Sequence, residues 1–189
     1  MAAQVSPSII AQVTQLRRHL HQYPELSLQE FETQRYLKDY LQALKPEALH
    51  AVGSTGLLAC FEGNTPGPTV LLRADIDALP IVETNEMAYR SQRQGVSHKC
   101  GHDGHAAIMA GVAAAFAERR PQKGKVLLLF QPAEEVGKGA EQVLNDPIFA
   151  SYTPDLAFAL HNLPGYALHK VVVAAPNFSA AVRSMIIRL

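Results

Sequence analysis

Apolar residues recur at helical spacing through residues 8–44. The positions that define this spacing are Ile9, Val13, Leu16, Leu20, Leu37, Leu41 and Leu44. A spacing of three or four positions is that of the buried face of an amphipathic helix. The segment 23–27 interrupts it, because Pro24 disfavours helix at the preceding residue and has no N–H to donate. The pattern therefore predicts two helices, the second starting near Ser27, with Glu30 three positions later completing a capping box.

Farther along the chain, short apolar runs predict β-strands. These runs cover residues 56–61, 69–74, 125–131, 156–160, 171–175 and 181–189. Turn residues fill positions 62–68, the alanine-rich segment 104–118 predicts a buried helix, and 139–145 predicts a shorter helix. Continuous apolar strands that alternate with helices indicate an α/β fold, with an open mixed sheet flanked by helices and covered on both faces.

The composition narrows the classes of partner. Hydrophobic residues make up 48% of the 189 positions, as in a globular protein, and 17 basic residues balance 17 acidic ones. This balance argues against nucleic-acid and membrane partners and favours a small-molecule substrate. No apolar run reaches the roughly 20 residues of a transmembrane helix, the first eight residues lack a secretory signal, and two cysteines suit a reducing compartment. We therefore expect a cytoplasmic protein.

The densest chemistry lies between His98 and His105. Three histidines, a cysteine and an aspartate fall within these eight positions, around two glycines and at the start of a predicted helix. Imidazole and thiolate are the preferred ligands of zinc and similar metals. Cys100 and His102 are two positions apart, so in an extended loop their side chains would share a face. We interpret the segment as a metal-binding loop rather than a chance cluster of polar residues.

Three more segments place carboxylates or histidine at the ends of predicted strands. Glu134 and Glu135 follow one strand, His161 another, and Asp75 and Asp77 a third. Each alone has an ordinary explanation, since most glutamate pairs are solvated and most lone histidines are structural. Sites in open α/β sheets nevertheless gather at the carboxyl ends of the strands. Of two adjacent glutamates there, one could bind the metal while the other accepts and donates protons.

Taken in order, these motifs resemble those of the di-metal amidohydrolases, which include hippurate hydrolases, aminoacylase-type N-acyl-amino-acid amidohydrolases and auxin-conjugate hydrolases. The motifs are Arg-Ala-Asp-Ile-Asp-Ala-Leu-Pro from Arg73, Cys-Gly-His-Asp-Gly-His from Cys100, Phe-Gln-Pro-Ala-Glu-Glu from Phe130 and Leu-His-Asn from Leu160. Residues 16–27 also match the N-terminal signature of that group. The resemblance implies a di-zinc aminopeptidase-like catalytic domain.

The resemblance also implies roles for individual residues. Cys100, His102, Glu135 and His161 correspond to ligands of a two-metal centre, and Glu134 corresponds to the general base that activates water there. Zinc or manganese suits this donor set best, and cobalt or nickel is an alternative. The expected reaction is hydrolysis of the amide bond of an N-acyl amino acid.

The resemblance implies less definite roles for the other polar residues of the motifs. Asp77 resembles the family's carboxylate that orients a metal ligand. Asp75 stands where related peptidases carry a metal histidine, and we leave it out of the ligand set. His98, Asp103 and His105 could line the pocket, cap the helix or replace a ligand.

Members of this group are about twice as long as this chain. They add a lid domain that usually mediates dimerisation, and then a final ligand histidine. By this resemblance, residues 1–180 are the N-terminal part of the catalytic domain, and residues 181–189 begin the first strand of the lid. We therefore expect a fragment with little or no activity, whose full-length parent is a homodimer.

Three other interpretations stay open. A dipeptidase or carboxypeptidase could use the same scaffold, because substrate preference depends largely on pocket residues outside this chain. A non-catalytic metal-binding module is a second alternative, although the Glu134–Glu135 pair argues for catalysis. A structural zinc knuckle is the weakest, because such sites use four regularly spaced cysteine or histidine ligands and only Cys100 lies near.

Overall fold

The computed structural model describes residues 5–173. Its helices are α1 (Pro7–Gln22), α2 (Phe31–Ala43), α3 (His102–Glu118), α4 (Gly139–Leu144) and α5 (Pro147–Ala150). Its strands are β1 (Ala48–Val52), β2 (Gly56–Glu62), β3 (Thr65–Asp75), β4 (Lys123–Gln131) and β5 (Leu156–Ala159). No helix within this described range is long and apolar enough to cross a membrane.

The five strands form one open sheet in the order β1-β2-β4-β3-β5. The strand β1 pairs antiparallel with β2, and β2 pairs antiparallel with β4. On the other side, β4 and β3 run parallel, with Leu72 opposite Leu128, and β3 runs parallel to β5. The predicted mixed α/β fold is therefore confirmed. Its parallel half places the carboxyl ends of β3, β4 and β5 at one edge of the sheet.

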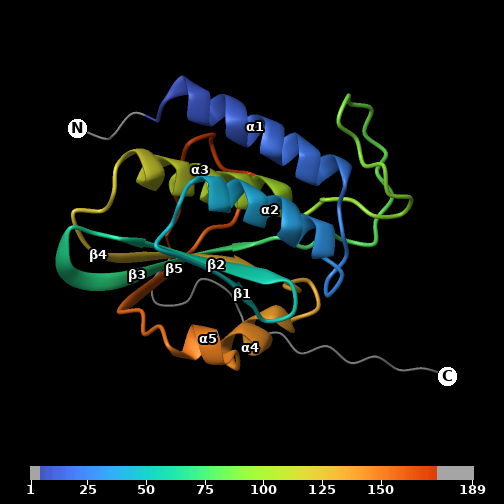
Figure 1. The fold of residues 1–189 in the computed structure, drawn as a ribbon. Coiled ribbons are helices and arrows are strands. Elements are labelled where there is room, and N and C mark those ends of the chain that lie inside the picture. The colour runs from blue at the N-terminus through green and yellow to red at the C-terminus, as the bar shows by residue number, and fades with distance from the viewer. Residues whose placement is uncertain (1–4, 174–189) are drawn as a thin grey trace.

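Helices cover both faces of the sheet, with α1, α2 and α3 on one side and α4 and α5 on the other (Figure 1). Side chains alternate between two apolar clusters along the central strands. In β4, Leu128 and Phe130 belong to the core under α1–α3, whereas Leu127 and Leu129 belong to the core next to α4 and α5. This alternation is the pleat of a strand buried on both faces. It explains the unbroken apolar run from which the strand was predicted.

The second helix begins later than predicted. It starts at Phe31, and Glu30 at its N-cap makes no side-chain capping bond. Both residues of the expected capping box bond elsewhere, because the Ser27 hydroxyl donates to Asp77 and the buried Glu30 carboxylate accepts from Thr55 and Ala133. The capping-box prediction was wrong, since tertiary hydrogen bonds outcompete the local one.

Three strand predictions also need correction. The strand β1 was not predicted, because Ala48–Val52 is short and interrupted by His50, and it forms by pairing with β2. The strand β3 reaches back to Thr65 through the predicted turn, with an irregularity in its register before Thr69. The strand β5 was expected to be buried, yet all four of its residues are exposed because it lies at the sheet edge.

Two further predictions fall at the C-terminal end. Residues 171–173 of the expected strand at 171–175 are not in a strand, and residues 174–175 lie outside the described residues. The expected strand at 181–189 and the expected domain boundary at residue 180 lie outside them too.

Candidate metal centre

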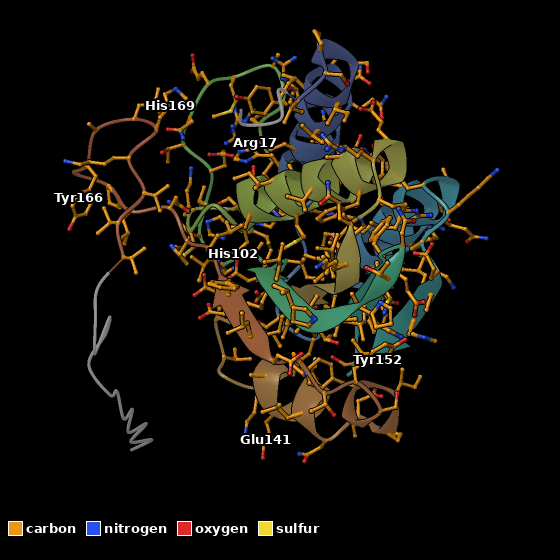
Figure 2. The ribbon with its side chains drawn as sticks, turned by 90° about the vertical axis from the view of Figure 1, so that its left-hand side faces the viewer. Arg17, His102, Glu141, Tyr152, Tyr166 and His169 are labelled. Atoms are coloured by element: carbon orange, nitrogen blue, oxygen red, sulfur yellow. The ribbon has the colours of Figure 1, made fainter. Side chains whose placement is uncertain are left out.

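The candidate site lies at the edge where the parallel strands end. Asp75 is the last residue of β3, Gln131 is the last residue of β4, and His161 follows the end of β5 by two positions. A polar side chain at the end of each of three adjacent parallel strands therefore faces one region, as the sequence predicted. The start of α3 brings the histidines of the predicted metal-binding loop to the same edge (Figure 2).

The metal-binding loop is sharply bent rather than extended. Gly101 has φ of +98°, in the left-handed region that favours glycine, and His102 is the first residue of α3. His105 follows one helical turn later on the same face of α3. The expectation of an extended Cys100–His102 segment was wrong, but the bend still brings the two side chains together.

One group of possible ligands contains Cys100, His102 and Glu135. One donor atom of each lies within 4.8 Å of the others. The Nε2 atom of His102 lies 3.7 Å from Oε1 of Glu135. These three residues are all members of the predicted ligand set.

A second group shares His102 and contains Asp75, His105 and His161, again within 4.8 Å. His161 connects the two groups, because its Nε2 lies 3.5 Å from the Cys100 sulfur. All four predicted ligands are thus brought together at this edge, and Asp75 and His105 lie beside them.

The hydrogen bonds of the three histidines show which ring nitrogens already have a partner in the protein. Both nitrogens of His105 have protein partners, since Nδ1 lies 2.6 Å from Oδ1 of Asp75 and Nε2 lies within hydrogen-bond distance of both the backbone N–H and the side-chain oxygen of Asn162. In His102, Nδ1–H donates to the backbone carbonyl of Asp77 and Nε2 has no hydrogen-bond partner. In His161, Nδ1–H donates to the Asn162 carbonyl and Nε2 faces the sulfur of Cys100, itself a candidate ligand. The Nε2 atom of His102 is therefore available to a cation, and that of His161 points at the same cluster.

Two buried polar atoms of the group formed by Cys100, His102 and Glu135 are left without a hydrogen-bond partner. They are Nε2 of His102 and Oε1 of Glu135, which face each other across the first group. An unpaired buried acceptor costs free energy, and a divalent cation between such atoms would remove that cost. The donor set of thiol, imidazole and carboxylate suits such a cation.

The electrostatics of Cys100 agree with this fit. Burial raises the pKa of its thiol to about 12, and the negative charge of Glu135 and other nearby carboxylates contributes to the rise. Burial likewise raises the pKa of Glu135. The site thus disfavours negative charge on these two groups. A metal ligand must be the thiolate, so a bound cation would compensate the negative charges of Cys100 and Glu135.

Hydrogen bonds and nearby positive charges favour the ionised form of two aspartates. For Asp75, burial acts to raise the pKa, but the hydrogen bond from His105 and the charges of His102 and Arg73 lower it to about 2. For Asp77, burial also acts to raise the pKa, and hydrogen bonds from His102, Ser27 and the Glu135 backbone outweigh it and lower the pKa. Asp77 therefore fixes both His102, through Nδ1–H, and the backbone of Glu135.

The two adjacent glutamates differ in exposure. The Glu134 side chain is 38% exposed and its Oε2 lies 3.9 Å from His102 Nε2, whereas Glu135 is 19% exposed. The preceding Ala133 has φ of +49°, which turns the chain sharply after β4. Glu134 therefore stands next to the ligand cluster but open to solvent.

The remaining motif residues lie near the cluster without joining it. Asp103 is buried and bonds Arg17 and His21 of α1, while His98 is buried with no hydrogen-bond partner on either ring nitrogen. Cys60 is buried within β2. The contacts of His21 and Glu30 were not predicted, because they connect positions far apart in the sequence and no local pattern marks them.

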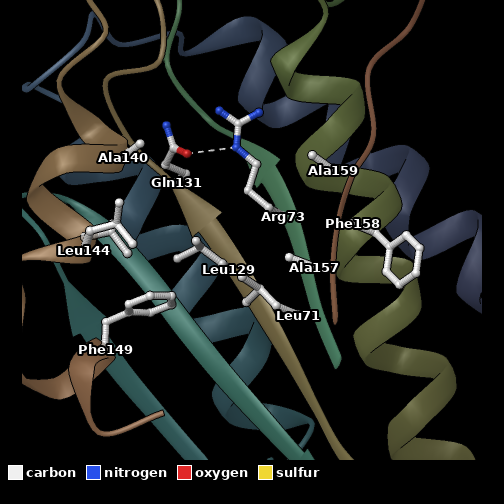
Figure 3. A pocket seen from close by; sticks show the side chains of 11 residues that line it. Leu71, Arg73, Leu129, Gln131, Ala140, Leu144, Phe149, Ala157, Phe158 and Ala159 are labelled. Atoms are coloured by element: carbon white, nitrogen blue, oxygen red, sulfur yellow. Dashed lines mark hydrogen bonds between the residues drawn. The ribbon is translucent and has the colours of Figure 1, made fainter. Parts of the chain in front are cut away.

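An apolar pocket lies on the other face of the sheet, beside α4 and α5. It has a volume of about 280 Å³ and is lined by side chains that include Leu129, Leu144, Phe149 and Phe158 (Figure 3). Its lining includes none of the candidate ligands. At its rim, Arg73 Nε donates to the side-chain oxygen of Gln131 at 2.9 Å, while the same guanidinium bonds Asp75.

The fold and the site are those of an α/β protein with an open sheet, in which possible metal-ligand side chains gather at the carboxyl ends of the parallel strands. Comparison with known proteins gives the family. Residues 71–179, more than half of the chain, match peptidase family M20/M25/M40, and the chain belongs to this family. The resemblance to the di-metal amidohydrolases is confirmed.

Curated relatives are deacetylases. The chain is 44% identical over 176 residues to an N-acetyl-L-cysteine deacetylase of Bacillus subtilis, covering 90% of this chain and 41% of that protein. It is 43% identical over 159 residues to an N-acetyldiaminopimelate deacetylase of Priestia megaterium, covering 84% and 42%. The chain therefore spans less than half the length of these relatives.

Solved structures agree in fold. A dinuclear metal-binding peptidase of the M20 family from Bacillus subtilis has a TM-score of 0.77 at 36% identity, over 84% of this chain and 44% of that one. A putative aminohydrolase from methicillin-resistant Staphylococcus aureus has a TM-score of 0.72 at 34% identity, over 82% and 42%.

Proposed function

We propose that the complete protein hydrolyses the amide bond of N-acyl amino acids, and that the present chain carries most of its metal-binding residues. The observation that supports this most directly is the convergence of Cys100, His102, Glu135 and His161 beside the partly exposed Glu134. The deacetylase relatives act on N-acetylated amino acids by name, which favours acetyl among the acyl groups considered. Hippurate-like and indolyl conjugates are the other candidates.

Four residues would hold two divalent metal ions: Cys100, His102, Glu135 and His161. The unpartnered Nε2 of His102, the unpartnered Glu135 oxygen and the contact of His161 Nε2 with the Cys100 sulfur support this assignment over one through His105, whose ring nitrogens both bond residues outside this ligand set. Bound divalent cations supply Lewis acidity, which lowers the pKa of water and polarises a carbonyl. Zinc and manganese suit the donors best, with cobalt and nickel as alternatives.

Glu134 would act as the general base. Its carboxylate stands beside the ligand cluster at 38% exposure, so it can reach both a water molecule and a substrate. It accepts a proton from the attacking water as the oxygen bonds to the carbonyl carbon. It then returns that proton to the amine nitrogen as the carbon–nitrogen bond breaks, which leaves a free carboxylate and an amino acid.

Asp77 and Asp75 would position these groups. Asp77 orients His102 through Nδ1–H and holds the Glu135 backbone, and its low pKa keeps it a hydrogen-bond acceptor at neutral pH. Asp75 holds His105 against the end of β3. Carboxylates that orient ligand histidines in this way increase the affinity of a site for metal.

The test is a hydrolysis assay on a chimaera that joins this chain to the remaining part of the Bacillus subtilis relative. We expect release of free amino acid from N-acetyl amino acids, faster than from hippurate and from dipeptides. Glu134→Gln should lower kcat by about 10²–10⁴-fold with metal content unchanged. Cleavage of dipeptides alone would support the peptidase alternative. Metal binding without any hydrolysis would support the non-catalytic one.

The present chain by itself should show little or no hydrolysis, because it spans less than half of its relatives' length. A rate equal to that of the chimaera would contradict this. A homodimeric parent and a cytoplasmic location complete the proposal, and sedimentation of the complete protein and cell fractionation test them.

A further inference from the structure

A second group of charged side chains lies next to the metal-binding loop. It contains Arg17 and His21 of α1, Glu83, Lys99 and Asp103. His21, Glu83 and Asp103 are buried. This group forms no part of the two possible metal-ligand groups. The proposed mechanism gives none of its members a role.

His21 is the centre of this group. Its Nδ1 lies 2.9 Å from Oδ2 of Asp103, and its Nε2 lies 2.8 Å from Oε2 of Glu83. Carboxylates only accept, so both ring nitrogens donate and the ring bridges the two acids. Arg17 donates to the same Asp103 oxygen at 3.1 Å, and the Lys99 ammonium pairs with the other oxygen of Glu83.

The two acids reach both ends of the ligand-bearing segment. Lys99, which pairs with Glu83, directly precedes Cys100, and Asp103 directly follows His102. Arg17 on α1 lies at the same end of α3 as His102 (Figure 2). One imidazole thus connects, through two carboxylates, to the residues on either side of Cys100 and His102.

The bridge is held in a fixed arrangement. The Glu83 and Asp103 side chains are 3% and 1% exposed, and the His21 side chain is 7% exposed. Charge-assisted hydrogen bonds between buried groups are stronger than neutral ones, and breaking them leaves an unpaired buried carboxylate. On its helical side, the bend at Gly101 is held by its own carbonyl, which accepts from the N–H groups of Gly104 and His105, and the His21 bridge adds contacts to the residues on either side of the segment from Cys100 to His102.

We propose that His21 is a positioning residue of the metal centre, which clamps both ends of the Cys100–His102 segment so that the thiol and the imidazole Nε2 face one cation. This inference rests on the metal centre in the proposed function. Loss of the clamp leaves all candidate ligands in place but lets the loop adopt other bends, so affinity and ligand geometry change together.

The test uses His21→Phe, which keeps an aromatic ring but removes both hydrogen bonds, in the full 189-residue chain. His19→Phe is the matched control, since His19 lies on the same helix and stacks on Tyr36 at 3.8 Å, outside the clamp. Cobalt(II) is the probe. Its affinity is measured by chelator competition, and its thiolate charge-transfer and visible bands report the ligand geometry.

Wild-type chain should bind cobalt with a thiolate band that Cys100→Ala abolishes. His21→Phe should weaken binding by about 10–100-fold and alter the visible bands, whereas His19→Phe should do neither. Circular dichroism establishes that each variant is folded. If His21→Phe does not fold, Glu83→Gln, which keeps a hydrogen-bond partner for His21 but weakens the pairing with Lys99, should show a smaller loss of the same kind.

Folded His21→Phe with wild-type affinity and spectrum would overturn the clamp while leaving the metal centre intact. So would Glu83→Gln with wild-type affinity and spectrum. A wild-type chain that binds no cobalt would instead contradict the metal centre itself, and the clamp with it.

Discussion

The carboxylate of Glu30 accepts a hydrogen bond from the backbone N–H of Ala133 at 2.7 Å, across a sequence separation of 103 positions. The same carboxylate accepts from the Thr55 hydroxyl at 2.6 Å and is fully buried. Ala133 has φ of +49°, a conformation that costs an alanine free energy, and it directly precedes Glu134 and Glu135. Glu30 therefore stabilises the turn that presents the two glutamates.

Glu30→Gln should destabilise the chain by about 1–3 kcal/mol, because an amide can accept only one of these two hydrogen bonds well and places a donor against the other. Chemical denaturation measures the loss. The matched control is Glu32→Gln, at the second position of α2 and exposed at the surface, which should change stability by less than about 0.5 kcal/mol. Equal effects of the two variants would contradict the role given to Glu30.

The stability contribution of Glu30 should depend on pH. Burial raises its pKa above the ordinary value of 4.5, and its hydrogen bonds only partly offset the effect. A raised folded-state pKa means that the favourable contribution is fully present below pH 4.5 and is lost as pH rises through the folded-state pKa. The advantage of wild type over Glu30→Gln should therefore shrink as pH increases across this window. An advantage that grows with pH would contradict the assigned direction.

Gly101 and Gly95 offer a matched pair of substitutions. Both have positive φ, of +98° and +74°, so alanine costs about 1–2 kcal/mol of backbone strain at either. Only at Gly101 would the added methyl group meet another residue, the Asn162 side-chain oxygen at 2.5 Å, while Gly95 faces open space. Gly101→Ala should weaken metal binding and Gly95→Ala should not. Titration calorimetry with zinc compares them, and equal affinities would show that the bend does not set the ligand geometry.

Asp77→Asn should weaken metal binding by about 10-fold or more, because the carboxylate that orients His102 and holds the Glu135 backbone loses its charge. Asp39→Asn makes the same chemical change on the exposed surface of α2 and serves as the control. Zinc affinity is again the measurement. A full-affinity Asp77→Asn variant would limit Asp77 to a purely structural role.

Much of the fold, and much of the cluster of candidate metal ligands, could be predicted from the sequence. Apolar runs buried on both faces mark β2 and β4, and residues at the ends of parallel strands must meet at one edge, so Asp75, Glu135 and His161 were placed near one another. The histidines at the start of α3 were found from their density in the sequence. The motif order then indicated the family.

The parts that could not be predicted depend on contacts between distant residues. Ser27 and Glu30 have the spacing of a capping box, yet both bond to partners across the fold. The engagement of both His105 nitrogens, which separates it from His102, is visible only in three dimensions. The exposure of β5 depends on its place at the sheet edge, which its apolar sequence does not reveal.

The most direct test of the metal centre is X-ray absorption at the zinc edge on the chain purified without chelator and loaded with zinc. We expect bound zinc with a sulfur neighbour at about 2.3 Å, from Cys100, together with nitrogen or oxygen neighbours. The sulfur signal should disappear in Cys100→Ala. Wild-type chain that retains no zinc, or zinc with only nitrogen and oxygen neighbours, would contradict the assignment of this loop.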